Sequence, residues 1–137
     1  MRLSKTSEYA LRVLSYMVNS DQQVFTAKKL VEMLDVPDKY LRRLMTDMSK
    51  KGFIRSIQGR IGGYVLAKSA NTLFLIDVID AVEGIEKYKG CIMGHDKCSD
   101  SNPCSLHKSY IPLRKQELEF LSKTSILTLK DNNIRKF

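Results

Sequence analysis

Three cysteines and one histidine are the residues of this chain whose types and spacing could bind a metal. Cys91, Cys98 and Cys104 are the only cysteines among 137 residues, and His107 follows the last of them by three positions. Because three is an odd number, a disulfide framework cannot use all of them. Three soft thiolates from one Gly-, Asp-, Ser- and Asn-rich loop instead indicate a metal or iron–sulfur cluster site.

Other uses of these cysteines remain open at this stage. A Cys-Cys-Cys-His set also suits structural zinc, although the final spacing of two residues is tighter than in zinc fingers. Without a metal, Cys98 and Cys104 could pair and leave Cys91 free. Lys97 and Lys108 would then favour a reactive thiolate. A catalytic Cys–His pair would need an orienting third group, which is not evident, so we expect no enzyme.

The elements that must position this loop are mainly helical. Apolar residues at helical spacing predict helices at about 4–19, 27–34, 37–51, 73–84 and 106–122. Thr26 suits the N-cap of the second helix and Pro37 the first turn of the third. Gly52 suits the position just past the third helix, and Gly84 ends the fourth. Two short helices joined by a tight turn form a helix-turn-helix.

A β-hairpin is expected directly after the helix-turn-helix. Phe53–Ile57 and Tyr64–Leu66 have strand character, and three glycines lie in the six residues between them. Such a hairpin is a wing. The predicted fold is therefore mainly α with a small β-wing. It divides into a winged helix-turn-helix domain (1–84), a cysteine-rich cluster loop (85–105), and a dimerisation helix with a frayed tail from Leu129 (106–137).

The last predicted helix carries an apolar stripe that needs a surface to pack on. Its members lie close to one helical face: Leu106, Tyr110, Leu113, Phe120 and Leu121. The helix could fold back on the winged domain. We expect instead that a second subunit covers the stripe, which would make the protein a homodimer.

The charge distribution favours a nucleic-acid partner. Residues 1–68 contain 13 of the 23 Lys and Arg residues but 6 of the 15 Asp and Glu residues, and so carry +7 of the net charge of +8. Cations that contact DNA phosphates release condensed counterions, which drives binding. No apolar run reaches the ~20 residues of a membrane span. No secretion signal is evident, so we expect a cytoplasmic protein without membrane contact.

Candidate DNA contacts follow from the position of each polar residue. The third helix should present its N-terminal end to the major groove, with Arg43 reading guanine and Lys39 on phosphate. Arg60, flanked by glycines at the wing tip, suits the minor groove. The full predicted set on double-stranded DNA is Lys28, Lys39, Tyr40, Arg42, Arg43, Arg60, Gly62 and Gly63.

Three stretches of the chain resemble the winged-helix regulator family typified by IscR and NsrR, the Rrf2 family. They are Met1–Ser4 with Glu8–Leu11, Tyr40–Leu44 with Gly52–Ser56 and Gly62–Ala67, and Asp77–Gly84 with the cysteine loop through His107. The likeness spans about residues 1–125. The sequence departs from the family at Arg60–Ile61, where a Gly-Pro-Gly-Gly-Gly-like run is common, and at Arg42, where an acidic residue is usual.

The resemblance implies a homodimeric transcriptional regulator that holds an iron–sulfur cluster, either 2Fe–2S or 4Fe–4S, on the three cysteines. Such members respond to redox state, nitric oxide or iron–sulfur status. IscR-like members use a histidine at the position of His107 as the fourth ligand, and we expect His107 to serve here. NsrR-like members use a carboxylate of the partner subunit at a position resembling Glu8. Zinc or no metal are the alternatives.

Overall fold

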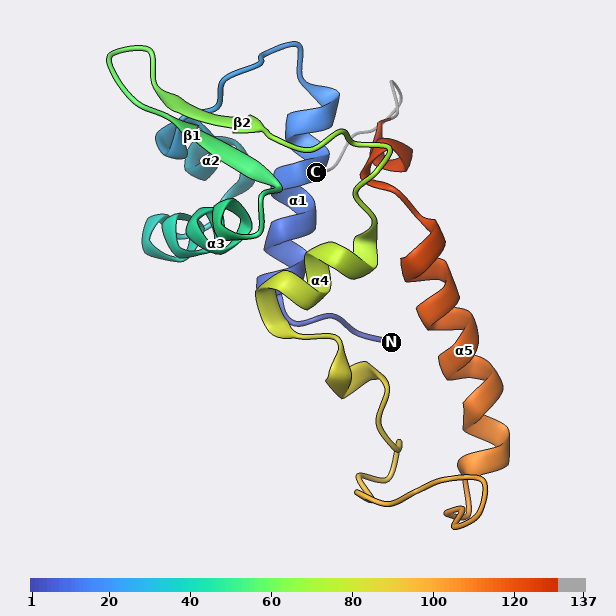
Figure 1. The fold of residues 1–137 in the computed structure, drawn as a ribbon. Coiled ribbons are helices and arrows are strands. Elements are labelled where there is room, and N and C mark those ends of the chain that lie inside the picture. The colour runs from blue at the N-terminus through green and yellow to red at the C-terminus, as the bar shows by residue number, and fades with distance from the viewer. Residues whose placement is uncertain (131–137) are drawn as a thin grey trace.

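The first helix forms the centre of the molecule. The structure, a computed structural model, describes residues 1–130. Helix α1 (Lys5–Asn19) begins after Ser4, whose Oγ accepts a hydrogen bond from the backbone N–H of Ser7. Ala10, Val13 and Leu14 are fully buried on one face, as their spacing predicts. Helices α2 to α4 surround this face (Figure 1).

Helices α2 (Ala27–Leu34) and α3 (Asp38–Lys50) form the expected helix-turn-helix. The Oγ1 of Thr26 accepts from the backbone N–H of Lys29 at 3.1 Å, which is the geometry of an N-cap. Asp35 ends α2 in the left-handed region with a φ of 51°, and this conformation turns the chain sharply toward α3.

The wing is a two-stranded antiparallel sheet. Strand β1 (Ile54–Ile57) pairs with β2 (Gly63–Leu66), and the chain before α2 adds one bridge from Phe25 to Tyr64. A Cβ atom on Gly62 would lie 2.4 Å from the carbonyl oxygen of Ile57, and one on Gly63 would lie 2.7 Å from that of Phe25. The tip therefore requires glycine at both positions.

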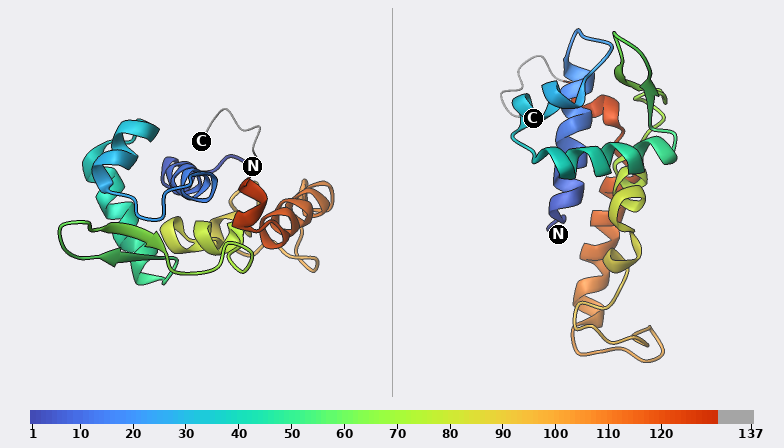
Figure 2. Two further views of the ribbon diagram at one scale, coloured as in Figure 1. Left: turned by 90° about the horizontal axis from the view of Figure 1, so that it is seen from above. Right: turned by 90° about the vertical axis from the view of Figure 1, so that its left-hand side faces the viewer.

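The second half of the chain leaves the winged part and returns to it. Helix α4 (Leu75–Glu83) and the short 3-10 helix η1 (Glu86–Tyr88) lead into the cysteine loop. Helix α5 (His107–Lys123) then runs back toward the core, where η2 (Ile126–Leu129) closes the fold. Figures 1 and 2 place the cysteine loop at the end of the molecule opposite the wing.

The end of α5 and η2 pack into the core of the winged part. Leu121 and Ile126 are buried there, and the backbone N–H of Ile126 donates to the carbonyl of Leu73 at 2.7 Å. Leu129, expected in a frayed tail, lies in η2, where its carbonyl accepts from Asn19 Nδ2 at 2.7 Å. The rest of that predicted tail, residues 131–137, lies outside the described residues.

The outer face of α5 stays exposed. Leu106, Leu113 and Phe120 keep 46%, 57% and 60% of their surface in contact with solvent, whereas Leu121 keeps 3%. The apolar residues predicted to form one stripe on this helix therefore belong to two faces: Leu121 is buried in the core, whereas Leu106, Leu113 and Phe120 face solvent. Pro112 lies inside α5 and cannot donate to the carbonyl of Lys108. No helix within residues 1–130 is long and apolar enough to cross a membrane.

Glu83 joins α1, α4 and η1 at one buried point. Its carboxylate accepts hydrogen bonds from Ser7 Oγ, Lys87 Nζ and, at 2.9 Å, from Tyr88 Oη. Burial raises the pKa of this carboxyl, but the surrounding donors outweigh burial and lower the pKa to about 2. The ionised form of Glu83 is therefore the one that stabilises the fold.

We expect Glu83→Gln to lower the free energy of unfolding at pH 7 by about 2–3 kcal/mol. Because the folded pKa lies below the ordinary value, this stabilisation is present above about pH 4.5 and is lost as the pH falls toward 2. Urea unfolding at several pH values measures it. Glu86→Gln, which removes an exposed ion pair with Lys89, is the control and should cost below about 0.5 kcal/mol.

Candidate metal centre and nucleic-acid interface

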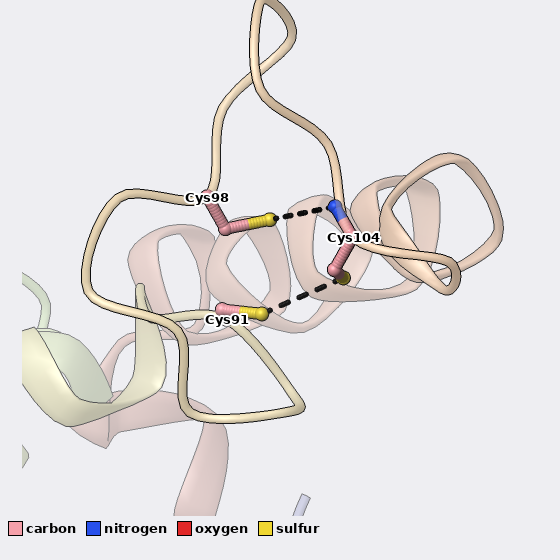
Figure 3. A group of neighbouring side chains, drawn as sticks. All are labelled: Cys91, Cys98 and Cys104. Carbon is pink, nitrogen blue, oxygen red and sulfur yellow. Dashed lines mark hydrogen bonds between the residues drawn. The ribbon is translucent and has the colours of Figure 1, made fainter.

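The three cysteine sulfur atoms converge in the loop between η1 and α5. Their Sγ atoms all lie within 4.8 Å of one another, and each side chain is half-buried (Figure 3). The Sγ atoms of Cys91 and Cys104 are 3.6 Å apart, and the backbone N–H of Cys104 lies 3.5 Å from Cys98 Sγ. All three thiols are free, so none is held away from a shared ligand by a disulfide.

Short-range hydrogen bonds shape this loop. Gly94, with a φ of 76°, closes a turn in which its N–H donates to the carbonyl of Cys91 at 3.0 Å. Ser99 and Asn102 exchange two backbone hydrogen bonds of 3.2 and 3.1 Å. The first turn follows Cys91, and the second lies between Cys98 and Cys104. Both reverse the chain, which brings the three cysteines close together.

Arg114 of α5 fixes the start of the loop. Its guanidinium Nη1 donates to the backbone carbonyls of Lys89 and Gly90 at 2.6 and 2.9 Å, directly before Cys91. At the other end, the N–H of His107 donates to the carbonyl of Cys104 at 3.1 Å. The first and third cysteines are thus both tied to α5.

The thiols differ in their acidity. The backbone N–H of His95 is the largest influence on Cys91 and, with that of Met93, lowers its pKa to about 7. The N–H of Cys104 lowers the pKa of Cys98, but burial and the neighbouring thiols outweigh it and raise the pKa overall. The largest influence on the pKa of Cys91 is thus a backbone N–H rather than the side chain of Lys97 or Lys108 that the sequence suggested.

His107 lies against the thiol of Cys98, whereas Glu8 lies elsewhere, on α1. The imidazole of His107 is 8% exposed, and its Nδ1 is 3.2 Å from Cys98 Sγ. Glu8 lies on α1 and pairs with Lys5 Nζ at 2.7 Å. Within the described part of one chain, His107 is thus the candidate fourth ligand that the fold brings beside one of the three thiols, that of Cys98. A donor set of three sulfurs and one nitrogen fits a cluster or zinc.

Four of the predicted DNA-contact residues line one groove between the helix-turn-helix and the wing. The groove has a volume of about 320 Å³, and its lining includes Lys28, Arg42, Gly62 and Gly63. Arg42 is held there by Asp38, whose carboxylate oxygens lie 3.1 and 2.9 Å from its Nε. Both partners of this pair are exposed, and the contact uses Nε of the guanidinium alone.

The remaining predicted contacts lie on either side of this groove. Lys39 and Arg43 are exposed on α3, and Arg60 is exposed at the wing tip. Tyr40 instead packs toward α1: its hydroxyl hydrogen-bonds Thr6 Oγ1, and its ring meets that of Tyr9 edge to face at 5.3 Å. The hydroxyl of Tyr40 thus has a partner within the protein, although the residue remains 37% exposed.

Sequence reasoning missed three residues that shape the site: Glu83, Asp100 and Arg114. Glu83 and Arg114 contact elements distant in the chain, and Asp100 contacts the ring of His107 across a turn. For Glu83 the i,i+4 spacing to Lys87 was the one local signal. The short spacing from Asp100 to His107 was the only signal available for that pair.

Comparison with known proteins gives one consistent result. The family model Rrf2, described as an iron-dependent transcriptional regulator, matches residues 3–132. An HTH-type transcriptional regulator assigned in Aquifex aeolicus is 30% identical over 131 residues, covering 94% of this chain and 91% of that protein. IscR of Xenorhabdus nematophila is 27% identical over 133 residues, covering 96% of this chain and 80% of IscR.

Solved structures share the fold. The oxidised form of Staphylococcus aureus CymR superposes with a TM-score of 0.76 at 24% identity, covering 98% of this chain and 99% of CymR. IscR of T. potens gives a TM-score of 0.70 at 19% identity, covering 92% of this chain and 83% of that one. At these identities the likeness concerns the winged-helix architecture.

Proposed function

This chain belongs to the Rrf2 family of transcriptional regulators and is not an enzyme, and we propose that an iron–sulfur cluster on its three cysteines controls its affinity for an operator. The observation that carries the proposal is the convergence of three free thiols within 4.8 Å. The signal would be redox state, nitric oxide or iron–sulfur status. Its place of action would be the cytoplasm, where the DNA is and free thiols persist.

The cluster would be held by Cys91, Cys98 and Cys104, with His107 as the fourth ligand. His107 is favoured over Glu8 because its Nδ1 already contacts Cys98 Sγ, whereas Glu8 would have to come from the partner subunit. A bound cluster supplies one-electron chemistry and a target for oxidants, and thiolates support both 2Fe–2S and 4Fe–4S types.

The protein would bind DNA as a homodimer joined through α5. Leu106, Leu113 and Phe120 are separated by seven residues each, so they form one seam along the helix, and all three are exposed. A second copy of the same seam is the occupant that fits a two-fold operator. In this proposal residues 1–84 form the DNA-binding domain, residues 85–105 the cluster loop, and residues 106–137 the dimerisation helix with its tail.

The loop would signal to the DNA-binding part through Glu83. The chain enters the loop directly after η1, and Lys87 and Tyr88 of η1 bind the same carboxylate as Ser7 of α1. Ordering of the loop around a cluster would fix the position of η1. Through Glu83 it would also fix the position of α1, and so the separation of the wings of the two subunits in the proposed dimer. A coupling free energy of about 1–3 kcal/mol is enough for such a switch.

Arg60→Ala is expected to weaken binding to the operator by about 1–3 kcal/mol and to reduce the salt dependence of binding by about one phosphate contact. The wing tip is the part of the hairpin free to enter a minor groove, and Arg60 is exposed there. Titration of a duplex selected by the wild-type protein from a random library measures both. Lys115→Ala on α5 removes the same charge and should leave binding unchanged; equal loss in both variants would exclude a wing contact.

Anaerobic purification with an absorption spectrum and with iron, sulfide and zinc analysis tests the cofactor. Visible charge-transfer bands with iron and sulfide would support the cluster. Zinc without visible bands would make the loop a structural site. A protein that contains neither iron nor zinc would favour the metal-free thiol switch. The lowered pKa of Cys91 is the observation that supports this alternative.

A further inference from the structure

Both ring nitrogens of His107 have partners in the cysteine loop. The Nδ1 atom lies 3.2 Å from Cys98 Sγ, and the Nε2 atom lies 2.9 Å from Asp100 Oδ1. The imidazole is 8% exposed, while the Asp100 side chain is fully exposed. The ring is thus buried with one edge toward the thiol of Cys98 and the other toward a carboxylate at the surface.

The hydrogen-bond partner of Nε2 determines which ring nitrogen carries the proton. It therefore determines whether the nitrogen that faces the Cys98 thiol has a free lone pair. An ionised carboxylate accepts hydrogen bonds and donates none, so Nε2 must carry the proton. In the neutral ring the lone pair is then on Nδ1, where the Cys98 thiol can donate to it. The ring atom that faces the Cys98 thiol is therefore the one able to bind a metal.

We propose that Asp100 is the positioning residue of this site, holding His107 in the Nε2–H tautomer with Nδ1 directed at the thiol of Cys98. Metal-binding histidines commonly donate their second ring N–H to a carboxylate, which fixes tautomer and orientation. The metal-binding part of the proposal rests on the proposed function. The tautomer of the metal-free protein does not.

The loop backbone places Asp100 where this contact is short. Asp100 lies in the turn closed by the two backbone hydrogen bonds between Ser99 and Asn102, and Asn102 Nδ2 also donates to the carbonyl of Lys97 at 3.1 Å. Asp96 is exposed in the same loop and hydrogen-bonds neither ring nitrogen of His107. It is therefore a matched control for the loss of a loop carboxylate.

The first test measures the tautomer in metal-free protein. The ring ¹⁵N chemical shifts of His107 are recorded, with His107→Gln separating them from those of His95. We expect the Nε2–H form in the wild type and in Asp96→Ala, and a mixture with the Nδ1–H form in Asp100→Ala. Asp100→Asn keeps an acceptor oxygen without the charge and should restore the Nε2–H form.

The second test measures the loaded protein. Asp100→Ala should lose iron to a chelator about 10–100-fold faster than the wild type, and the ¹⁴N coupling of His107 in pulsed EPR of the reduced cluster should weaken. An unchanged tautomer in Asp100→Ala, or an equal change in Asp96→Ala, would overturn the proposal. A changed tautomer in a protein that binds neither iron nor DNA would uphold the positioning role and overturn the proposed function instead.

Discussion

Cys98→Ala is expected to remove the visible absorption of the anaerobically purified protein and to abolish the response of operator affinity to oxidant. Cys98 is central among the thiols, since its Sγ contacts both His107 Nδ1 and the backbone N–H of Cys104. Removing one ligand of four should lower cluster retention by more than the roughly 10–100-fold that loss of a supporting contact costs. Iron and sulfide analysis with operator titration before and after oxidant measures both effects.

The control for this variant is Ser101→Ala, which removes one exposed hydroxyl contact with Ser99 in the same loop. It should retain the cluster and the response. If Cys98→Ala kept both its operator affinity and its response to oxidant, the cysteine loop would have no part in regulation, and the proposal would fail.

Leu113→Glu is expected to weaken the dimer by at least about a hundredfold in its dissociation constant. Burying one leucine is worth about 1.5–3 kcal/mol, and a two-fold interface loses the contact twice. Leu113 is 57% exposed in the single chain, so its loss should leave the core of each protomer intact. Sedimentation equilibrium measures the constant, and circular dichroism checks that the helices persist.

Ser122→Glu is the matched control on the opposite face of α5. It adds the same charge at an exposed position that hydrogen-bonds only the carbonyl of Leu118. We expect it to remain dimeric. Equal dissociation in both variants would indicate a general charge effect, and a monomeric wild type would exclude the dimer itself.

The fold was predictable wherever the signal is local. The caps at Ser4 and Thr26, the helical stripes and the glycines of the wing tip lie within a few residues of the structure they determine. Cysteine spacing likewise predicted the convergence of the thiols, since all three lie in one loop.

What the sequence could not predict depends on partners brought together by the fold. Helical spacing placed Leu121 and Phe120 close to one face, but the position of the core decides that Leu121 is buried and Phe120 is exposed. Tyr40 was expected on DNA; its contacts with Thr6 and Tyr9 of α1 could not be read from the sequence. Arg114 and Glu83 act on elements distant in the chain, and no local pattern predicted those contacts.

Pro112 gives α5 two parts that need not move as one. The missing hydrogen bond to the carbonyl of Lys108 falls one turn after His107, so the turn that carries this candidate ligand is joined to the rest of the helix by fewer backbone hydrogen bonds. Beyond Pro112 lie Leu113 and Phe120 of the proposed seam. Leu106, the third member of the proposed seam, precedes Pro112. A swing of the first turn would therefore move one end of the seam while Leu113 and Phe120 stayed in place, so the proposed dimer could remain assembled while its affinity for DNA changed.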